Sequence, residues 1–185
     1  MAPAPAHMTV DEYFRTPVAL TPMELIYGRF RAAESPAVRH QSAVAQLFLT
    51  LHAHVKERGI GQMWLSPLDV VLDEDRALIM QPDLFFISRE RAWIVHERIW
   101  GAPDLVIEVL SPHPRIGETE ERVRLFAEHG VRECWLVHQD RQEVIVIAYA
   151  DRRIHNQTIF TSRSPVRSAV LPDFAASWEQ IFADN

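Results

Sequence analysis

Two acidic side chains stand out because they interrupt apolar stretches of the chain. Glu108 lies within the run Leu-Val-Ile-Glu-Val-Leu at 105–110, and Asp83 directly precedes the apolar residues 84–87. An ionised carboxylate in such surroundings is unfavourable unless it is paired, hydrogen-bonded or bound to a metal. If the two strands are neighbours, the carboxylates also repel each other. A Mg²⁺ ion, which proteins hold with one or two carboxylates plus water and phosphate oxygens, would relieve both problems.

The pattern also leaves a second interpretation open, in which each acid lies at a strand end and faces solvent or an arginine. Asp104 shares a strand face with Glu108, but four residues along a strand span roughly 13 Å, so these two acids cannot bind one ion together. His40 is either an ordinary hydrogen-bonded histidine or a catalytic group. Cys134 is the only cysteine, which excludes an intramolecular disulfide and a paired-cysteine zinc site.

Two helices are expected to position these groups. The first begins after Ser35, a good N-cap, with Pro36 in its first turn, and ends at Gly59. Its buried face is predicted by apolar residues at helical spacing, namely Val44, Leu47, Phe48, Leu51 and Val55. The second helix is predicted from about residue 117 to 129, with Gly130 as its stop. A short helical turn at 10–14 and a short C-terminal helix near 178–182 complete the helical elements.

The remaining apolar segments are typical of strands. A hairpin is predicted at 23–30, with its turn near Tyr27 and Gly28. Further strands are predicted at 64–72, with a break at Pro67, and at 78–87, 104–110, 133–137, 143–149 and 154–161. This order of elements indicates a mixed α/β domain with a mixed central sheet covered by helices.

Composition limits the class of protein. Of the 185 residues, 48% are hydrophobic and 24% are charged, which is typical of one globular domain. We expect a loose tail at residues 1–9 and a single domain at 10–185. No signal peptide or membrane-spanning run is apparent, so a cytoplasmic protein is expected. The net charge of −6 disfavours non-specific nucleic-acid binding by the surface as a whole.

The whole series of motifs resembles the Uma family of proposed bacterial restriction endonucleases, within the PD-(D/E)XK nuclease superfamily. The matching segments are MELIYG at 23–28, His40-Gln41, QPDL at 81–84, GAPDLVIEVLSP at 101–112 and LFAEHGVRECWLV at 125–137. The resemblance covers the chain from about Thr9 to Phe182. It implies a restriction-endonuclease-like α/β core, DNA as substrate and Mg²⁺ or Mn²⁺ as cofactor.

The resemblance also implies roles for particular residues. Asp83 and Glu108 match the metal-binding acids, and the backbone carbonyl of Val109 would supply a further oxygen ligand. Glu24 matches an acid contributed by the N-terminal hairpin. Arg122 stands where this family carries its catalytic lysine, on the second helix.

This arginine is a departure with chemical consequences. Lys56 is the only lysine of the chain, and it lies near the end of the first helix. An arginine grips phosphate with a planar fork and keeps its charge, but it cannot act as a base. Activation of water would therefore fall to the metal, with Glu24 accepting the proton. Alternatively, Arg122 is a solvated helix residue paired with Glu118 or Glu121.

Two functions are consistent with the sequence. The first is a Mg²⁺-dependent DNA endonuclease that works as a homodimer, because a two-fold protein with two sites suits the cutting of both DNA strands. The second is a catalytically impaired module of the same fold that serves binding or assembly, which the arginine in place of lysine favours.

Overall fold

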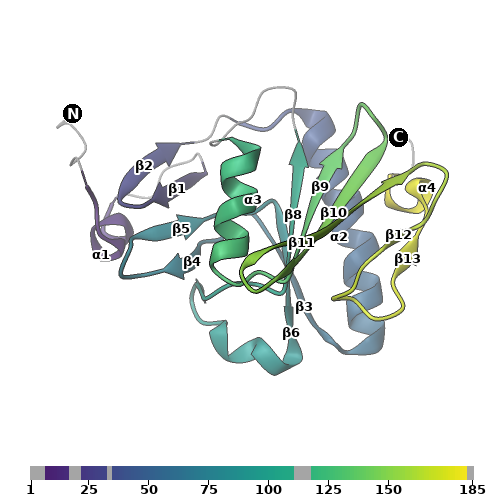
Figure 1. Ribbon diagram of the computed structural model, residues 1–185. Helices are drawn as coiled ribbons and strands as arrows, with labels where there is room; N and C mark the ends of the chain where they lie inside the picture. The colour runs from purple at the N-terminus through teal and green to yellow at the C-terminus, as the bar shows by residue number, and fades with distance from the viewer. Residues whose placement is uncertain (1–6, 17–21, 33–34, 111–117, 183–185) are drawn as a thin grey trace.

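A computed structural model describes residues 7–16, 22–32, 35–110 and 118–182 (Figure 1). Its centre is a six-stranded sheet with the order β11-β10-β9-β8-β6-β3. The bounds of these strands are β3 Gly61–Leu65, β6 Leu84–Ser88, β8 Leu105–Leu110, β9 Glu133–His138, β10 Glu143–Ala150 and β11 Arg153–Thr161. Strands β8 and β9 run parallel, whereas the other neighbours run antiparallel. The mixed sheet expected from the sequence is therefore confirmed.

A second, five-stranded sheet carries the N-terminal hairpin, with the order β2-β1-β5-β4-β7. Its strands are β1 Met23–Ile26, β2 Arg29–Ala32, β4 Val70–Asp73, β5 Leu78–Met80 and β7 Ile99–Trp100. The hairpin turns at Tyr27 and Gly28 as predicted, and both of these residues have positive φ. A 3-10 helix, η1 (Arg89–Ile94), leads from the large sheet towards β7.

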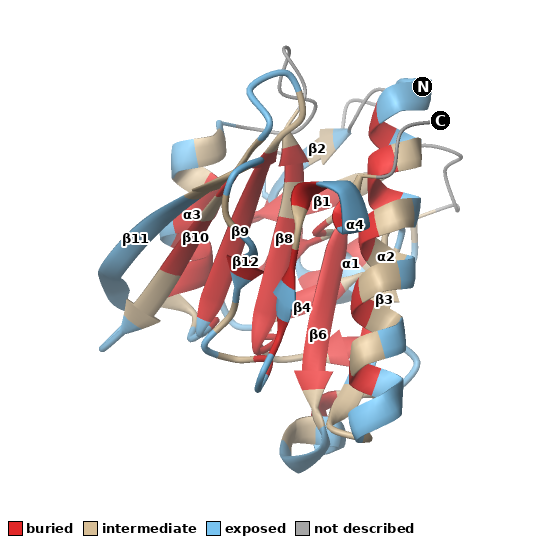
Figure 2. Ribbon diagram, turned by 90° about the vertical axis from the view of Figure 1, so that its right-hand side faces the viewer, coloured by how far each residue is buried: buried red, intermediate tan, exposed pale blue. Residues whose placement is uncertain are grey.

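Helices cover both faces of the large sheet (Figures 1 and 2). The helices are α1 Val10–Phe14, α2 Val38–Arg58, α3 Thr119–Glu128 and α4 Trp178–Ile181. Because strand side chains alternate between faces, Leu105 and Ile107 pack with α2 and α4. Val106 faces the other side and packs with α3. A short pair, β12 (Val166–Arg167) and β13 (Ala175–Ala176), precedes α4.

The helix boundaries differ from the predicted ones at their starts. Helix α2 begins at Val38, because Ala37 at its N-cap is still extended, with φ −71° and ψ 158°; Ser35 therefore caps nothing. Its end at Gly59, which adopts the left-handed conformation, is as predicted. Helix α3 begins at Thr119, and Gly117 lies outside the described residues. At the N-terminus, Met8 is buried and Thr9 caps α1.

Two predicted strands are each divided in two. The segment 64–72 becomes β3 and β4, which lie in different sheets, with Pro67 between them. The segment 78–87 becomes β5 and β6, again in different sheets, with Pro82 between them. Proline lacks the N–H group that a ladder needs, so the chain leaves one sheet and enters the other at these points. The second division places Asp83 at a junction rather than inside a strand.

Within the residues that the structure describes, no helix is both long enough and apolar enough to cross a membrane.

The core under α2 gives a stability prediction. Leu47 is completely buried, whereas Leu49 of the same helix is 61% exposed. We expect Leu47→Ala to lower the free energy of unfolding by about 2–5 kcal/mol, because it removes buried methyl groups and leaves a cavity. Leu49→Ala is the matched control, and it should change stability by no more than about 0.5 kcal/mol. Urea unfolding measures both, and similar losses in the two variants would contradict this packing.

Candidate functional site

Four elements bring the predicted site residues together at one end of the large sheet. Glu24 comes from β1, Glu108 from β8 and Arg122 from α3, and Asp83 directly precedes β6. Strands β6 and β8 are antiparallel with Leu84 opposite Ile107, so the same register places Asp83 opposite Glu108. The two acids that lie far apart in the sequence are thus close enough for the charge of Asp83 to act on Glu108, while Asp83 contacts His40 of α2 and Glu108 contacts Arg122 of α3.

Arg122 lies between two carboxylates. Its Nη1 donates to Glu24 Oε2 at 2.6 Å. Its Nη2 and Nε both donate to Glu108 Oε1, at 2.7 and 3.2 Å. The side chains are largely removed from water, with exposed fractions of 10% for Arg122, 12% for Glu108 and 0% for Glu24. The interpretation of Arg122 as a solvated residue paired with Glu118 or Glu121 is therefore wrong.

Glu24 is held by the main chain as well as by the arginine. Its Oε1 accepts a hydrogen bond from the backbone N–H of Gln81 at 2.7 Å, while Oε2 accepts from Arg122. Gln81 belongs to the junction between the two sheets, so this carboxylate fixes the small sheet to the entrance of β6. A second ion pair, between Arg31 of β2 and Glu121, ties the hairpin to α3.

Asp83 is oriented by two donors. Its Oδ2 accepts a hydrogen bond from the backbone N–H of Val109 at 2.8 Å and lies 3.1 Å from Nε2 of His40. His40 is buried on α2, so it links the helix to the acid. The sequence favoured an ordinary hydrogen-bonded histidine here over a catalytic one, because His40 shares a helix face with Val44 and Leu47. The role of the Val109 carbonyl as a metal ligand stays a prediction.

The environment changes the pKa values of this group. Burial raises the pKa of Glu108 to about 8; the charge of Arg122 opposes this, and the charges of Asp83 and Glu24 add to it. Burial lowers the pKa of Arg122, but the charges of Glu108 and Glu24 outweigh burial and raise it above its usual value. Arg122 therefore stays protonated, while Glu108 holds its proton to a higher pH than an exposed glutamate does.

The donor set suits a hard divalent cation. Among these side chains, the carboxylates of Glu24, Asp83 and Glu108 outnumber the single guanidinium, and burial, more than the neighbouring acids, raises the pKa of Glu108. In the described part of the chain, no three His, Cys, Asp or Glu side chains are clustered so as to hold a metal by themselves. Mg²⁺ commonly uses one or two carboxylates and completes its shell with water and phosphate oxygens, so a site on Asp83 and Glu108 stays a prediction.

The buried ion pair gives a stability prediction. We expect Glu24→Ala to lower the free energy of unfolding by about 3–5 kcal/mol, because it removes the carboxylate that the buried Arg122 Nη1 and the Gln81 N–H donate to, and leaves Arg122 with Glu108. Arg124→Ala is the control, since Arg124 pairs with Glu128 on the exposed side of α3. An exposed pair contributes no more than about 1 kcal/mol. Chemical denaturation measures the free energy of unfolding of both variants. Equal losses in the two would contradict a larger contribution from the buried ion pair.

The raised pKa of Glu108 gives a pH prediction. The folded state holds this proton more tightly than the unfolded state, whose pKa is near 4.5. Glu108 therefore contributes stability that is fully present below pH 4.5 and is lost as the pH rises to about 8. Between pH 4.5 and about 8, the free energy of unfolding of wild type should fall by on the order of 1–4 kcal/mol relative to that of Glu108→Gln. Unfolding curves at several pH values test this, with Glu128→Gln as an exposed control, and a constant difference would refute the shift.

Comparison with known proteins places this arrangement in a family. The chain has the fold of a crystallised protein from Anabaena variabilis ATCC 29413, which is described as "a putative nuclease belonging to DUF820". That similarity has a TM-score of 0.79 at 20% sequence identity and covers 95% of this chain and 98% of the other. No curated protein matches the sequence. A family model described as "Putative restriction endonuclease" matches residues 10–179, and the chain therefore belongs to this family, Uma2.

Proposed function

We propose that this protein is a divalent-metal-dependent endonuclease that hydrolyses DNA phosphodiester bonds. The observation that carries the proposal is the meeting of Asp83 and Glu108 at one sheet end, with Arg122 bridging Glu108 and Glu24. Membership of the restriction endonuclease family and the nuclease fold of the structural relative support it. A homodimer with two such sites suits cleavage of both strands of a duplex.

Asp83 and Glu108 are the residues that would hold Mg²⁺ or Mn²⁺. The ion would supply a bound water of lowered pKa and positive charge at the scissile phosphate. Asp83 is well prepared for this role, because the Val109 N–H and His40 fix the direction of its carboxylate. Glu108 must lose its proton to serve as a ligand, and its pKa of about 8 means that metal binding strengthens as the pH rises through that value.

Arg122 cannot remove a proton from water, because a guanidinium remains charged in proteins. It contributes positive charge beside the phosphate and fixes the carboxylate of Glu108 through two N–H groups. Glu24, expected from the sequence to accept the proton of the attacking water, is instead a positioning residue, since its two oxygens are engaged by Gln81 and Arg122. The acceptor of the proton from the attacking water is then solvent or the phosphate rather than a side chain of this group.

The same ion pairs favour a second candidate, a nuclease-fold module that binds or assembles without cleaving. Arg122 neutralises part of the charge that a metal would otherwise balance, so the acids have a structural partner within the chain. Calorimetric titration with Mn²⁺ separates the two functions. Saturable binding that is lost in Asp83→Asn supports the nuclease, whereas no binding supports the module.

Nicking of supercoiled plasmid tests the activity directly. We expect wild type to nick in Mg²⁺ or Mn²⁺ but not in EDTA. Asp83→Asn should reduce the rate by at least about 100-fold, because changes in the outer shell of a metal site alone typically cost about 10–100-fold. Asp140→Asn is the control, since Asp140 forms an exposed pair with Arg39. Equal nicking by wild type and Asp83→Asn would reject the assignment of Asp83.

A further inference from the structure

The large sheet ends at β3, and the outer edge of this strand pairs with no strand in the described chain. Its other edge pairs antiparallel with β6. At the two ends of that ladder, Arg89 N–H donates to the Ile60 carbonyl at 2.9 Å and Ser66 N–H donates to the Asp83 carbonyl at 3.0 Å. These two bonds fix which residues of the strand turn their backbone groups towards β6.

Hydrogen-bonded and non-hydrogen-bonded pairs alternate along an antiparallel ladder. Since Ile60 and Ser66 both bond towards β6, every second residue between them does the same. The residues in the alternate positions, Gly61, Met63 and Leu65, therefore direct their backbone N–H and C=O groups away from β6. This edge offers an extended chain the hydrogen-bonding pattern of one more strand.

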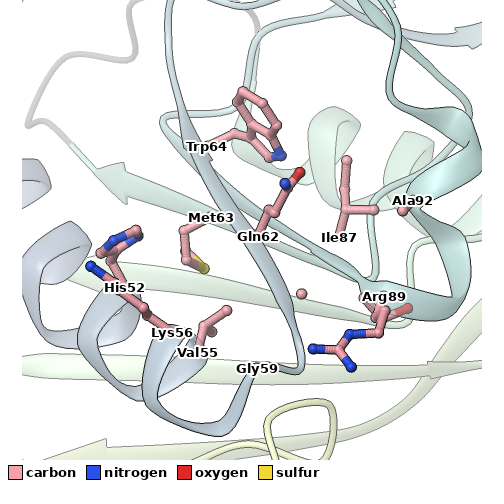
Figure 3. A pocket seen from close by; sticks show the side chains of 12 residues that line it. His52, Val55, Lys56, Gly59, Gln62, Met63, Trp64, Ile87, Arg89 and Ala92 are labelled. Atoms are coloured by element: carbon pink, nitrogen blue, oxygen red, sulfur yellow. The ribbon is translucent and has the colours of Figure 1, made fainter.

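A groove of about 610 Å³ follows this edge (Figure 3). Val55 and Met63 line it from the core on the α2 face, and Trp64 and Ile87 line it from the core on the α3 face. An added strand needs room on both faces, because its side chains alternate between them. The Gly61 end of the groove lies away from the candidate metal site, since Gly61 is opposite Ser88 and the length of β6 between Asp83 and Ser88 is roughly 16 Å.

The groove has a cationic end. Lys56 at the end of α2 and Arg89 beyond β6 both line it near Gly61, and none of the described residues that line it is acidic. Gly59 leaves room for the guanidinium, because a Cβ there would lie 2.9 Å from Arg89 Nη2. Two buried nitrogen atoms of the wall, His52 Nδ1 and Trp64 Nε1, have no hydrogen-bond partner among the described residues. These two nitrogen atoms of the groove wall thus form no hydrogen bond with the described residues.

Size and charge decide between possible occupants. A strand of five residues buries too little surface for a stable dimer, which needs about 1,200–2,000 Å² in total. β3 runs from Gly61 to Leu65, so a strand added antiparallel to it has its carboxyl terminus beside Gly61. Lys56 and Arg89 line the groove at this end. We propose that the free edge of β3 binds the carboxyl-terminal end of an extended peptide, whose terminal carboxylate pairs with these two cations.

The test uses an acetylated five-residue peptide that alternates threonine and valine, made with a free carboxyl terminus and, separately, as the amide. Binding to the full chain is followed by NMR and by amide hydrogen exchange. The free acid should slow exchange at the Met63 and Leu65 amides and leave the Gln62 amide unchanged, because that amide already bonds towards β6. The amidated peptide should bind about fivefold more weakly, as expected for the loss of exposed ion pairs.

Variants make the result specific. In the double variant Lys56→Ala, Arg89→Ala, the acid and the amide should bind equally, whereas Arg58→Ala should behave as wild type, since Arg58 does not line the groove. The proposal is overturned if wild type binds both peptides equally or if the Met63 and Leu65 amides gain no protection. It is also overturned if these amides are protected by self-association without peptide, or if an oligothymidine displaces the free acid.

Discussion

The structure depends on the need to pair charges that the fold removes from water. Arg122 and Glu24 are buried among apolar layers, and each has the other as a partner. Glu108 shares the same guanidinium. An unpaired charge in such a place is strongly unfavourable. The two ion pairs among these three side chains must therefore form together. The pairing explains why a hairpin remote in sequence closes over the end of the large sheet.

This pairing adds directional bonds where hydrophobic packing already joins the two sheets. One apolar cluster of the small sheet includes Leu25 and Ile79, and a second cluster packs Ile26 and Met80 of that sheet against the large sheet and α3. The Gln81 N–H and Arg122 meet at Glu24, so the junction between the sheets is fixed by directional bonds. Asp83 lies two residues beyond Gln81, and its orientation follows from that junction. Stability and the geometry of the site therefore have a common origin.

Local signals in the sequence predicted the main helices and the mixed sheet and singled out Asp83 and Glu108, whereas the family resemblance pointed to Glu24 and Arg122. The apolar spacing from Val44 to Val55 and the glycine at 59 predicted α2, and an acid within the run 105–110 marked Glu108. The break at Pro67 was predicted, but the change of sheet there and the division at Pro82 were missed, because apolar residues continue on both sides and a change of sheet is a long-range event. The carboxylate partners of Arg122 were also beyond local pattern, since they lie 98 and 14 residues away.

The central claim is that Asp83 and Glu108 bind one divalent cation while Arg122 keeps its place beside them. Crystals soaked in Mn²⁺ test this most directly through the anomalous scattering of the metal. The account predicts a single anomalous peak in contact with carboxylate oxygens of both Asp83 and Glu108, and no such peak in crystals of Asp83→Asn. Manganese bound elsewhere, or no peak at saturating Mn²⁺, would contradict it.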